Sequence, residues 1–145
     1  MTAPARTIAP NSALPAGPRR WYSISIGFAV LFIFLQSLTA GEFITGGLAD
    51  DTKEVWTTIH GFTSYPVMIA SLAATVIAYR YLRASPRLAL LTGALFVGSV
   101  VQWLLGHAIT TLGMDWVTPL HVTLAFVVYG LAIVLSIRSA SLRKV

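Results

Sequence analysis

Four long apolar segments, separated by short polar stretches, dominate the pattern of hydrophobic and polar positions along the chain. A helix needs about 20 predominantly apolar residues to cross the hydrocarbon core of a bilayer, and each segment reaches that length. We therefore predict an all-α fold, an integral membrane four-helix bundle whose helices run up, down, up and down. The predicted spans are about 21–41, 54–80, 88–112 and 118–138.

The two ends of the chain lack this apolar pattern. Residues 1–18 are rich in Pro, Ala and small polar residues, which predicts a disordered cytosolic tail. Residues 140–145 form a short basic cytosolic tail, so the four-span bundle occupies residues 19–139. The apolar run after Arg19 and Arg20 is too long for the core of a signal peptide, and we interpret it as the first span.

Local signals indicate where the second and fourth spans begin. Asp51, followed three residues later by Glu54, resembles a capping box. Thr118 is expected as the N-cap of the fourth helix, with Pro119 at the first helical position. Pro66 is expected to bend the second span, because it removes one backbone N–H inside a helix.

The composition supports a bilayer as the solvent of this chain. Hydrophobic residues make up 56% of the sequence and charged residues 10%, and the mean hydropathy is +0.76. Soluble domains carry about 25% charged residues. The chain has no cysteine, which excludes disulfides, thiolate metal ligands and covalent attachment of a c-type heme.

Charge divides the connecting segments into two groups. Nine of the ten basic residues lie in the two tails or the middle turn, and Lys53 is the exception. The nine are Arg6, Arg19, Arg20, Arg80, Arg83, Arg87, Arg138, Arg143 and Lys144. The five acidic residues lie in the other two loops and are Glu42, Asp50, Asp51, Glu54 and Asp115. The positive-inside rule then places both termini in the cytosol, for a multi-pass protein of the inner cell membrane. Because the basic residues are spread over three segments without a binding motif, no nucleic-acid partner is expected.

Three histidines lie inside the apolar spans, where an ionisable side chain is costly to bury and is by default a functional hypothesis. At about 1.5 Å of rise per residue, His60, His107 and His121 all lie roughly 6 to 8 Å below the outer boundary. Spans two and four sit diagonally in such a bundle, so His60 and His121 face one another across the core. This is the arrangement that a bis-histidine heme requires, and we predict His60 and His121 as ligands of the iron of a heme b.

The helix faces next to this pair carry slim side chains that leave room for a flat ring. They are Ser64, Val67, Ser71 and Thr75 after His60, and Ala125, Val128 and Ala132 after His121. Span three adds Gly98, Gln102 and Gly106 at a spacing of four residues. A stripe of this kind lets either a neighbouring helix or a porphyrin approach closely, and helix packing is the simpler explanation for the stripe alone.

These residues lie in segments that resemble heme A synthase, an eight-span enzyme built from two similar four-helix bundles with histidines on the second and fourth helices of each. The matching segments are IHGF around His60, VQWLLGHAIT in span three and PLHVTLAFVVYGLAI from Pro119 to Ile133, together with Gln36 in span one. The likeness covers roughly Phe34 to Val134, and it extends to small four-span bacterial membrane proteins with the same histidine pattern. It implies a half-length relative that holds a stable heme b, as the C-terminal half of the synthase is thought to do.

The chain also departs from the synthase. In the catalytic half of that family a glutamate stands three residues before the second-helix histidine and an arginine directly after it, whereas Thr57 and Gly61 occupy these positions here. Glu54 lies one helical turn too early, and the cysteine pair often found in the first outer loop is missing. These differences argue against heme A synthesis, and leave an oxidoreductase-like heme protein as the enzyme class to consider.

Three functions remain open at this point. The first is a b-type heme protein for electron transfer or heme handling, with His107 beside the ligands or as an alternate ligand. The second is a zinc, copper or proton site made by the three histidines with Glu42. The third is a cofactor-free structural or accessory membrane subunit. Gln36, Gln102 and His107 could bind a quinone headgroup or satisfy neighbouring helices, and a homodimer that rebuilds eight helices is a further arrangement to test.

Overall fold

The computed structural model describes residues 16–44, 46–83 and 85–142, and nearly all of them are helical. The elements are α1 (Ala16–Ile44), α2 (Asp50–Tyr81), α3 (Pro86–Leu112), the short 3-10 helix η1 (Asp115–Val117) and α4 (Thr118–Leu142). No strand occurs in these ranges. The four α-helices are long and apolar enough to span a membrane, and they confirm the predicted all-α fold with four long apolar helices.

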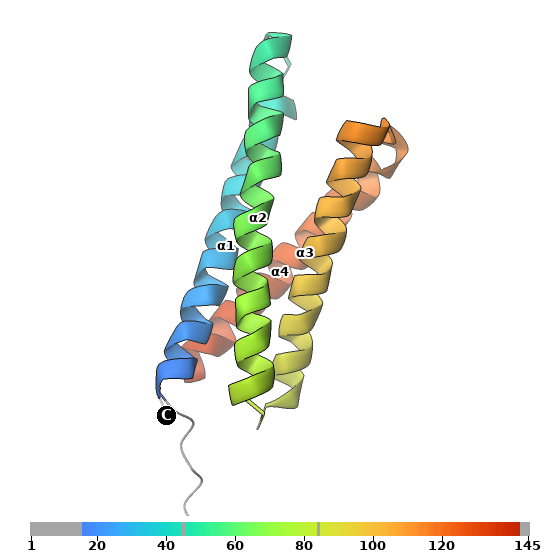
Figure 1. Ribbon diagram of the computed structural model, residues 1–145. Helices are drawn as coiled ribbons and strands as arrows, with labels where there is room; N and C mark the ends of the chain where they lie inside the picture. Colours follow the sequence, from blue (N-terminus) through green and yellow to red (C-terminus); the bar gives the residue numbers. More distant parts are fainter. Residues whose placement is uncertain (1–15, 45, 84, 143–145) are drawn as a thin grey trace, which may run out of the picture.

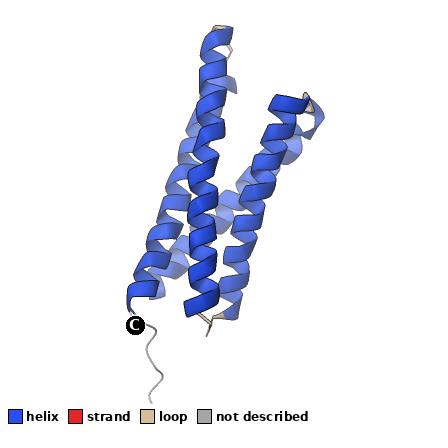
Figure 2. Cartoon of the chain, viewed as in Figure 1, coloured by secondary structure: helices blue, strands red, loops and turns tan. Residues whose placement is uncertain are grey.

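The four helices pack in a ring in the order of the sequence. Backbone contacts join each helix to its two neighbours, and within the described ranges neither α1 and α3 nor α2 and α4 bring Cα atoms within 8 Å. Consecutive helices run in opposite directions in Figure 1, and Figure 2 shows the loops confined to the two ends of the bundle. The chain therefore forms two helical hairpins, α1–α2 and α3–α4, with α2 and α4 at opposite corners.

Most of the helices extend beyond the predicted spans. Helix α1 begins at Ala16, and the rest of the predicted tail, residues 1–15, lies outside the described residues. At the other end α4 continues to Leu142, so only residues 143–145 of the basic tail lie outside the description. Helix α2 runs without interruption through Pro66.

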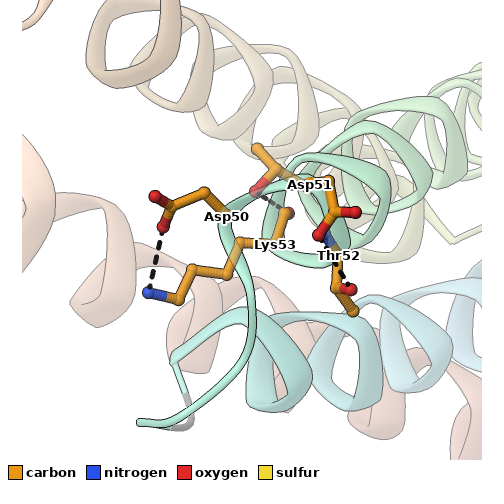
Figure 3. A network of polar contacts seen from close by, with 5 residues as sticks. Asp50, Asp51, Thr52 and Lys53 are labelled. Carbon is orange, nitrogen blue, oxygen red and sulfur yellow. Dashed lines mark hydrogen bonds and ion pairs between the residues drawn. The ribbon is translucent and has the colours of Figure 1, made fainter.

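The predicted helix caps are wrong, because both helices begin earlier than the cap signals suggest. The N-cap of α2 is Ala49, which makes no side-chain capping bond, and Asp51 already lies in the first turn. There its Oδ1 accepts the backbone N–H of Thr52 at 2.7 Å, while Lys53 lies 3.8 Å from Asp50 (Figure 3). Thr118 likewise has helical backbone angles, φ −54° and ψ −45°, since η1 leads directly into α4.

The packed core lies at one end of the bundle. The two hairpins lie close together near the α2–α3 turn and separate toward the other end (Figure 1). The largest fully buried apolar side chains all lie in the closed part and are Tyr22, Ile26, Leu82, Leu95 and Leu135. Inside this core the Tyr22 hydroxyl bonds to Thr92 Oγ1 at 2.9 Å, which ties α1 to α3 across the bundle.

Buried positions repeat between the two hairpins. Positions 22, 26, 29 and 33 of α1 recur in α3 as 88, 92, 95 and 99, each 66 residues later. Positions 67, 71, 74 and 78 of α2 recur in α4 as 128, 132, 135 and 139, each 61 residues later. The two hairpins thus present the same register of side chains to their shared core.

Candidate functional site

His60 on α2 and His121 on α4 meet just above the packed core, where the two hairpins begin to separate. Their ring centroids lie 6.4 Å apart and the ring planes make an angle of 64°. Both side chains are half-buried. The core positions below them, Val67 and Val128, lie two turns further along the same helix faces, so both histidines belong to the inward stripes of their helices.

The hydrogen bonds of His60 define which of its nitrogens carries the hydrogen. Its Nδ1 lies 3.0 Å from the backbone oxygen of Gln36 and 3.2 Å from Thr39 Oγ1. A carbonyl oxygen only accepts, so Nδ1 donates and the neutral ring keeps its lone pair on Nε2. Within the described residues Nε2 has no hydrogen-bond partner. This is the tautomer in which histidine binds a metal, with the second nitrogen oriented by a backbone carbonyl.

His121 has a different environment that leaves two polar atoms without a partner. Gln102 Nε2 donates to the backbone oxygen of His121 at 2.9 Å and lies 3.2 Å from ring Nε2. An amide N–H only donates, so ring Nε2 accepts and Nδ1 carries the hydrogen. Nδ1 of His121 and Oε1 of Gln102 are buried without a hydrogen-bond partner in the described part of the chain. Buried polar atoms are almost always paired, so this pair of orphans marks a place where another group can bind.

The same glutamine–histidine unit occurs in both hairpins. Gln36 Nε2 donates to the backbone oxygen of His60 at 3.2 Å, as Gln102 does to that of His121. The two glutamines are 66 residues apart and the two histidines 61, the same offsets as those of the buried positions. The two histidines therefore occupy equivalent positions in two equivalent hairpins, and they approach each other where these hairpins meet.

The spacing of the two rings fits a single metal ion between them. A metal–imidazole bond is about 2.0 to 2.1 Å long and the nitrogen lies about 1.1 Å from the ring centroid, so one shared metal separates two centroids by about 6.3 Å. The observed separation is 6.4 Å. In this arrangement His60 offers the lone pair of Nε2, whereas Nδ1 of His121 carries the hydrogen, so His121 would bind a metal only after a change of tautomer or after its Nε2 leaves Gln102.

His107 does not join this pair. Its side chain is exposed on α3, where it stacks on Trp103 with centroids 5.6 Å apart and contacts Thr111 Oγ1 at 3.2 Å. Trp103 in turn packs near Tyr65 of α2, at 6.4 Å between centroids. His107 thus belongs to a row of aromatic rings on the outside of the bundle.

The alternative metal site of three histidines with Glu42 is not assembled. Glu42 and His107 are exposed, and the described residues contain no cluster of three or more His, Cys, Asp or Glu side chains that could hold a metal ion. Among the described residues, the pair of His60 and His121 is the remaining candidate for holding a metal, and it would supply two of the ligands.

The glycine stripe of α3 packs against α4. A Cβ atom added at Gly98 would lie 3.0 Å from Val128 Cγ2, and one added at Gly106 would lie 3.2 Å from His121 Cε1. The stripe therefore serves close helix packing, as its sequence pattern suggested on its own. Gly106 also forms part of the wall around the His121 ring.

Two residues at the site were not identified from the sequence. Thr39 contacts His60 Nδ1, and Phe43 lies with its ring centroid 5.4 Å from that of His60. They follow Gln36 by three and seven residues, so they share one face of α1. That spacing is the signal that could have found them.

Comparisons with protein families, with curated proteins and with solved structures find no match to this chain.

Proposed function

We propose that this chain is a membrane b-type heme protein in which His60 and His121 are the two axial ligands of one heme. The observation that carries the proposal is a pair of imidazoles at equivalent positions with centroids 6.4 Å apart, of which His60 has the lone pair of Nε2 free of hydrogen bonds to the described residues. The resemblance of the histidine segments to heme A synthase supports the same cofactor and the proposal that the chain is a half-size relative of that family.

The role proposed for the heme protein is electron transfer or heme handling. A bound heme would supply a one-electron couple, with a potential that depends on its ligands and surroundings. The chain itself holds the ligands: the Gln36 carbonyl orients the His60 ring, and Gln102 anchors the backbone of His121. Among the described residues, the His60 ring has a side-chain hydrogen bond to Thr39 and ring contacts with Phe43 and His121.

The proposed orientation has both termini in the cytosol and the heme nearer the outer face of the inner cell membrane. The described arginines flank the closed end of the bundle, and the acidic residues lie with Lys53 in or beside the two connections at the open end, which supports an up-down-up-down insertion by the positive-inside rule. The lipid bilayer is then the first partner of the exposed apolar helix surfaces. Exposed His107 stacked on Trp103 makes the outer end of α3 the place for a membrane quinone or another redox partner.

Replacing the two histidines one at a time tests the proposal. In protein purified from heme-supplemented cells, His60→Ala and His121→Ala should each lose the spectrum of a six-coordinate low-spin heme, because each removes one axial ligand. His107→Ala is the matched control: it removes an imidazole of similar depth that lies outside the site, so it should keep the heme with at most a change in potential.

Loss of heme in His107→Ala with retention in His60→Ala would refute the assigned ligand pair. Unchanged spectra in both ligand variants would refute heme ligation by these residues altogether.

A further inference from the structure

A second candidate site lies at the closed end of the bundle, far along the helices from the histidines. A hollow of about 430 Å³ opens there between the beginning of α3 and the end of α4. Two arginines from different helices, Arg87 and Arg138, line it, together with the apolar side chains of Pro86, Leu88 and Leu142. This hollow shares no residue with the heme site.

The two arginines that line the hollow have no carboxylate partner among the described residues. The one ion pair in the described residues joins Lys53 and Asp50 at the opposite end of the bundle. Arg87 and Arg138 form no hydrogen bond within the described chain. Every aspartate and glutamate lies in or beside the two connections at the other end, so the described helices offer no acidic side chain to this hollow.

The position of Arg87 makes the positive potential stronger. It lies in the first turn of α3, next to the positive end of the helix dipole, and that turn contains no acidic residue. A cation is unfavourable at this place in a helix, and a bound anion would offset it. The cationic turn and Arg138 of the neighbouring helix converge on one hollow, so they can contact the same anion.

A third arginine fixes one wall of the hollow. Arg19 of α1 donates from Nη1 to the backbone oxygen of Leu142 at 3.0 Å and so ties the end of α4 to α1. Its charge adds to that of the other two arginines, and its hydrogen bond holds the apolar Leu142 wall in place. The site therefore combines fixed positive charge with an apolar rim.

We propose that this hollow binds a phosphate group, carried by an anionic phospholipid of the cytosolic leaflet. Arginine pairs with phosphate through charge-assisted, often bidentate hydrogen bonds. Basic pockets between membrane helices on the cytosolic side are places where anionic headgroups bind. The apolar side chains beside the arginines favour a lipid over a free phosphate ion, since they can contact the glycerol and upper acyl chains.

Thermal unfolding of the purified full chain in mixed micelles tests this site. Phosphatidylglycerol should raise the midpoint above that in an equal amount of phosphatidylcholine, because a ligand that binds only the folded protein stabilises it. The double variant Arg87→Gln/Arg138→Gln should lose this difference. Its affinity for phosphatidylglycerol should fall by a factor of about ten or more. Arg80→Gln is the control: it removes one positive charge, half of that lost in the double variant, at the same end of the bundle from a residue that does not line the hollow.

Folding of each variant is checked by its helical circular dichroism in phosphatidylcholine alone. Arg138→Lys keeps the positive charge and should therefore retain most of the preference for phosphatidylglycerol. A shift produced equally by millimolar sodium phosphate, at matched ionic strength, would retain the phosphate site and overturn the lipid as its source. Equal midpoints in both lipids, or an equal loss in Arg80→Gln, would overturn the site and leave only general surface charge.

Discussion

Gln102 donates a short hydrogen bond to the backbone of His121, yet each of these two residues has one buried polar atom without a partner in the described chain. The bond to the backbone of His121 ties α3 to α4, while Nδ1 of the ring and Oε1 of the amide are buried without partners in the described chain. A buried polar atom left unpaired costs about 1 to 3 kcal/mol, so a chain that retains two of them gives up measurable stability. Binding of a cofactor at this position would recover part of that cost.

Gly106→Ala tests the wall around this ring. The new Cβ would lie 3.2 Å from His121 Cε1, so the ring has to move by a few tenths of an ångström. We expect a shifted heme spectrum or potential, with a change in stability of about 1 kcal/mol or less because alanine also favours the helix. Absorption spectra and thermal unfolding of the same preparation measure the two effects.

Gly93→Ala serves as the control for that variant. Its Cβ would meet the Tyr79 ring at an ordinary contact distance of 3.5 Å, away from both histidines. It should leave the heme spectrum unchanged. A Gly106→Ala spectrum identical to that of the parent would show that the His121 ring is not held where the structure puts it.

At the scale of the helices, the repeated register makes the two hairpins equivalent. Offsets of 66 residues between α1 and α3 and of 61 between α2 and α4 relate the core positions, the glutamines and the histidines alike. Two equivalent hairpins that face each other bring the same pair of residue types, a glutamine and a histidine, to the place where they meet. A ligand that needs two identical donors on opposite sides, as a bis-histidine heme does, suits such a meeting place.

The hydrogen bond between Tyr22 and Thr92 joins the two hairpins inside the core. Thr92 Oγ1 donates to the Leu88 carbonyl at 2.7 Å, so the Tyr22 hydroxyl is the donor in the 2.9 Å bond between them. In Tyr22→Phe, Thr92 keeps its own acceptor, so the cost should be small, about 0.5 to 1 kcal/mol. Unfolding of the purified protein in detergent measures this difference.

Tyr81→Phe removes a hydroxyl from an exposed tyrosine at the end of α2 and should be neutral. If Tyr22→Phe and Tyr81→Phe both have the same free energy of unfolding as the parent, the buried hydroxyl pair does not hold the hairpins together.

The helices were predictable because about 20 apolar residues in a row have few alternatives to a membrane span. The helix ends were less so: Asp51 and Glu54 have the spacing of a capping box, yet α2 starts before Asp51, because nothing in that local signal fixes the first residue of the helix. Likewise Ala16 continues α1 into a stretch whose composition suggested a tail.

At the site, topology and depth alone predicted that His60 and His121 lie close together, and the structure places their ring centroids 6.4 Å apart. It did not reveal which face of span three carries His107, since that span is apolar on all sides and its stripe of Gly98, Gln102 and Gly106 alone distinguishes one face. The contacts of Thr39 and Phe43 with His60 depend on how α1 is rotated, and a segment apolar all round leaves that rotation to packing.

At the scale of the whole molecule, the two ends of the bundle differ both in charge and in how closely the helices pack. The closed end holds the packed core and the described arginines, whereas the open end holds the acidic loops and the histidine pair. In the proposed orientation the hairpins are held together near the cytosol and are free to accommodate a cofactor toward the outer face.

Reporter fusions test this orientation. Reporters at either terminus should be active in the cytosol, and a reporter inserted between Ala49 and Lys53 should be active outside, because the basic segments stay on the cytosolic side. An external C-terminus would contradict both the four-span insertion and the outer position of the histidines.

The central claim is that one heme b binds between His60 and His121, and the visible spectrum of the purified parent protein tests it most directly. Protein from heme-supplemented cells, with heme content measured against chain concentration, should carry one heme b per chain. It should show a Soret band and the sharp reduced α-band of a six-coordinate low-spin heme. Well-folded protein that is colourless at stoichiometric concentration would contradict the account.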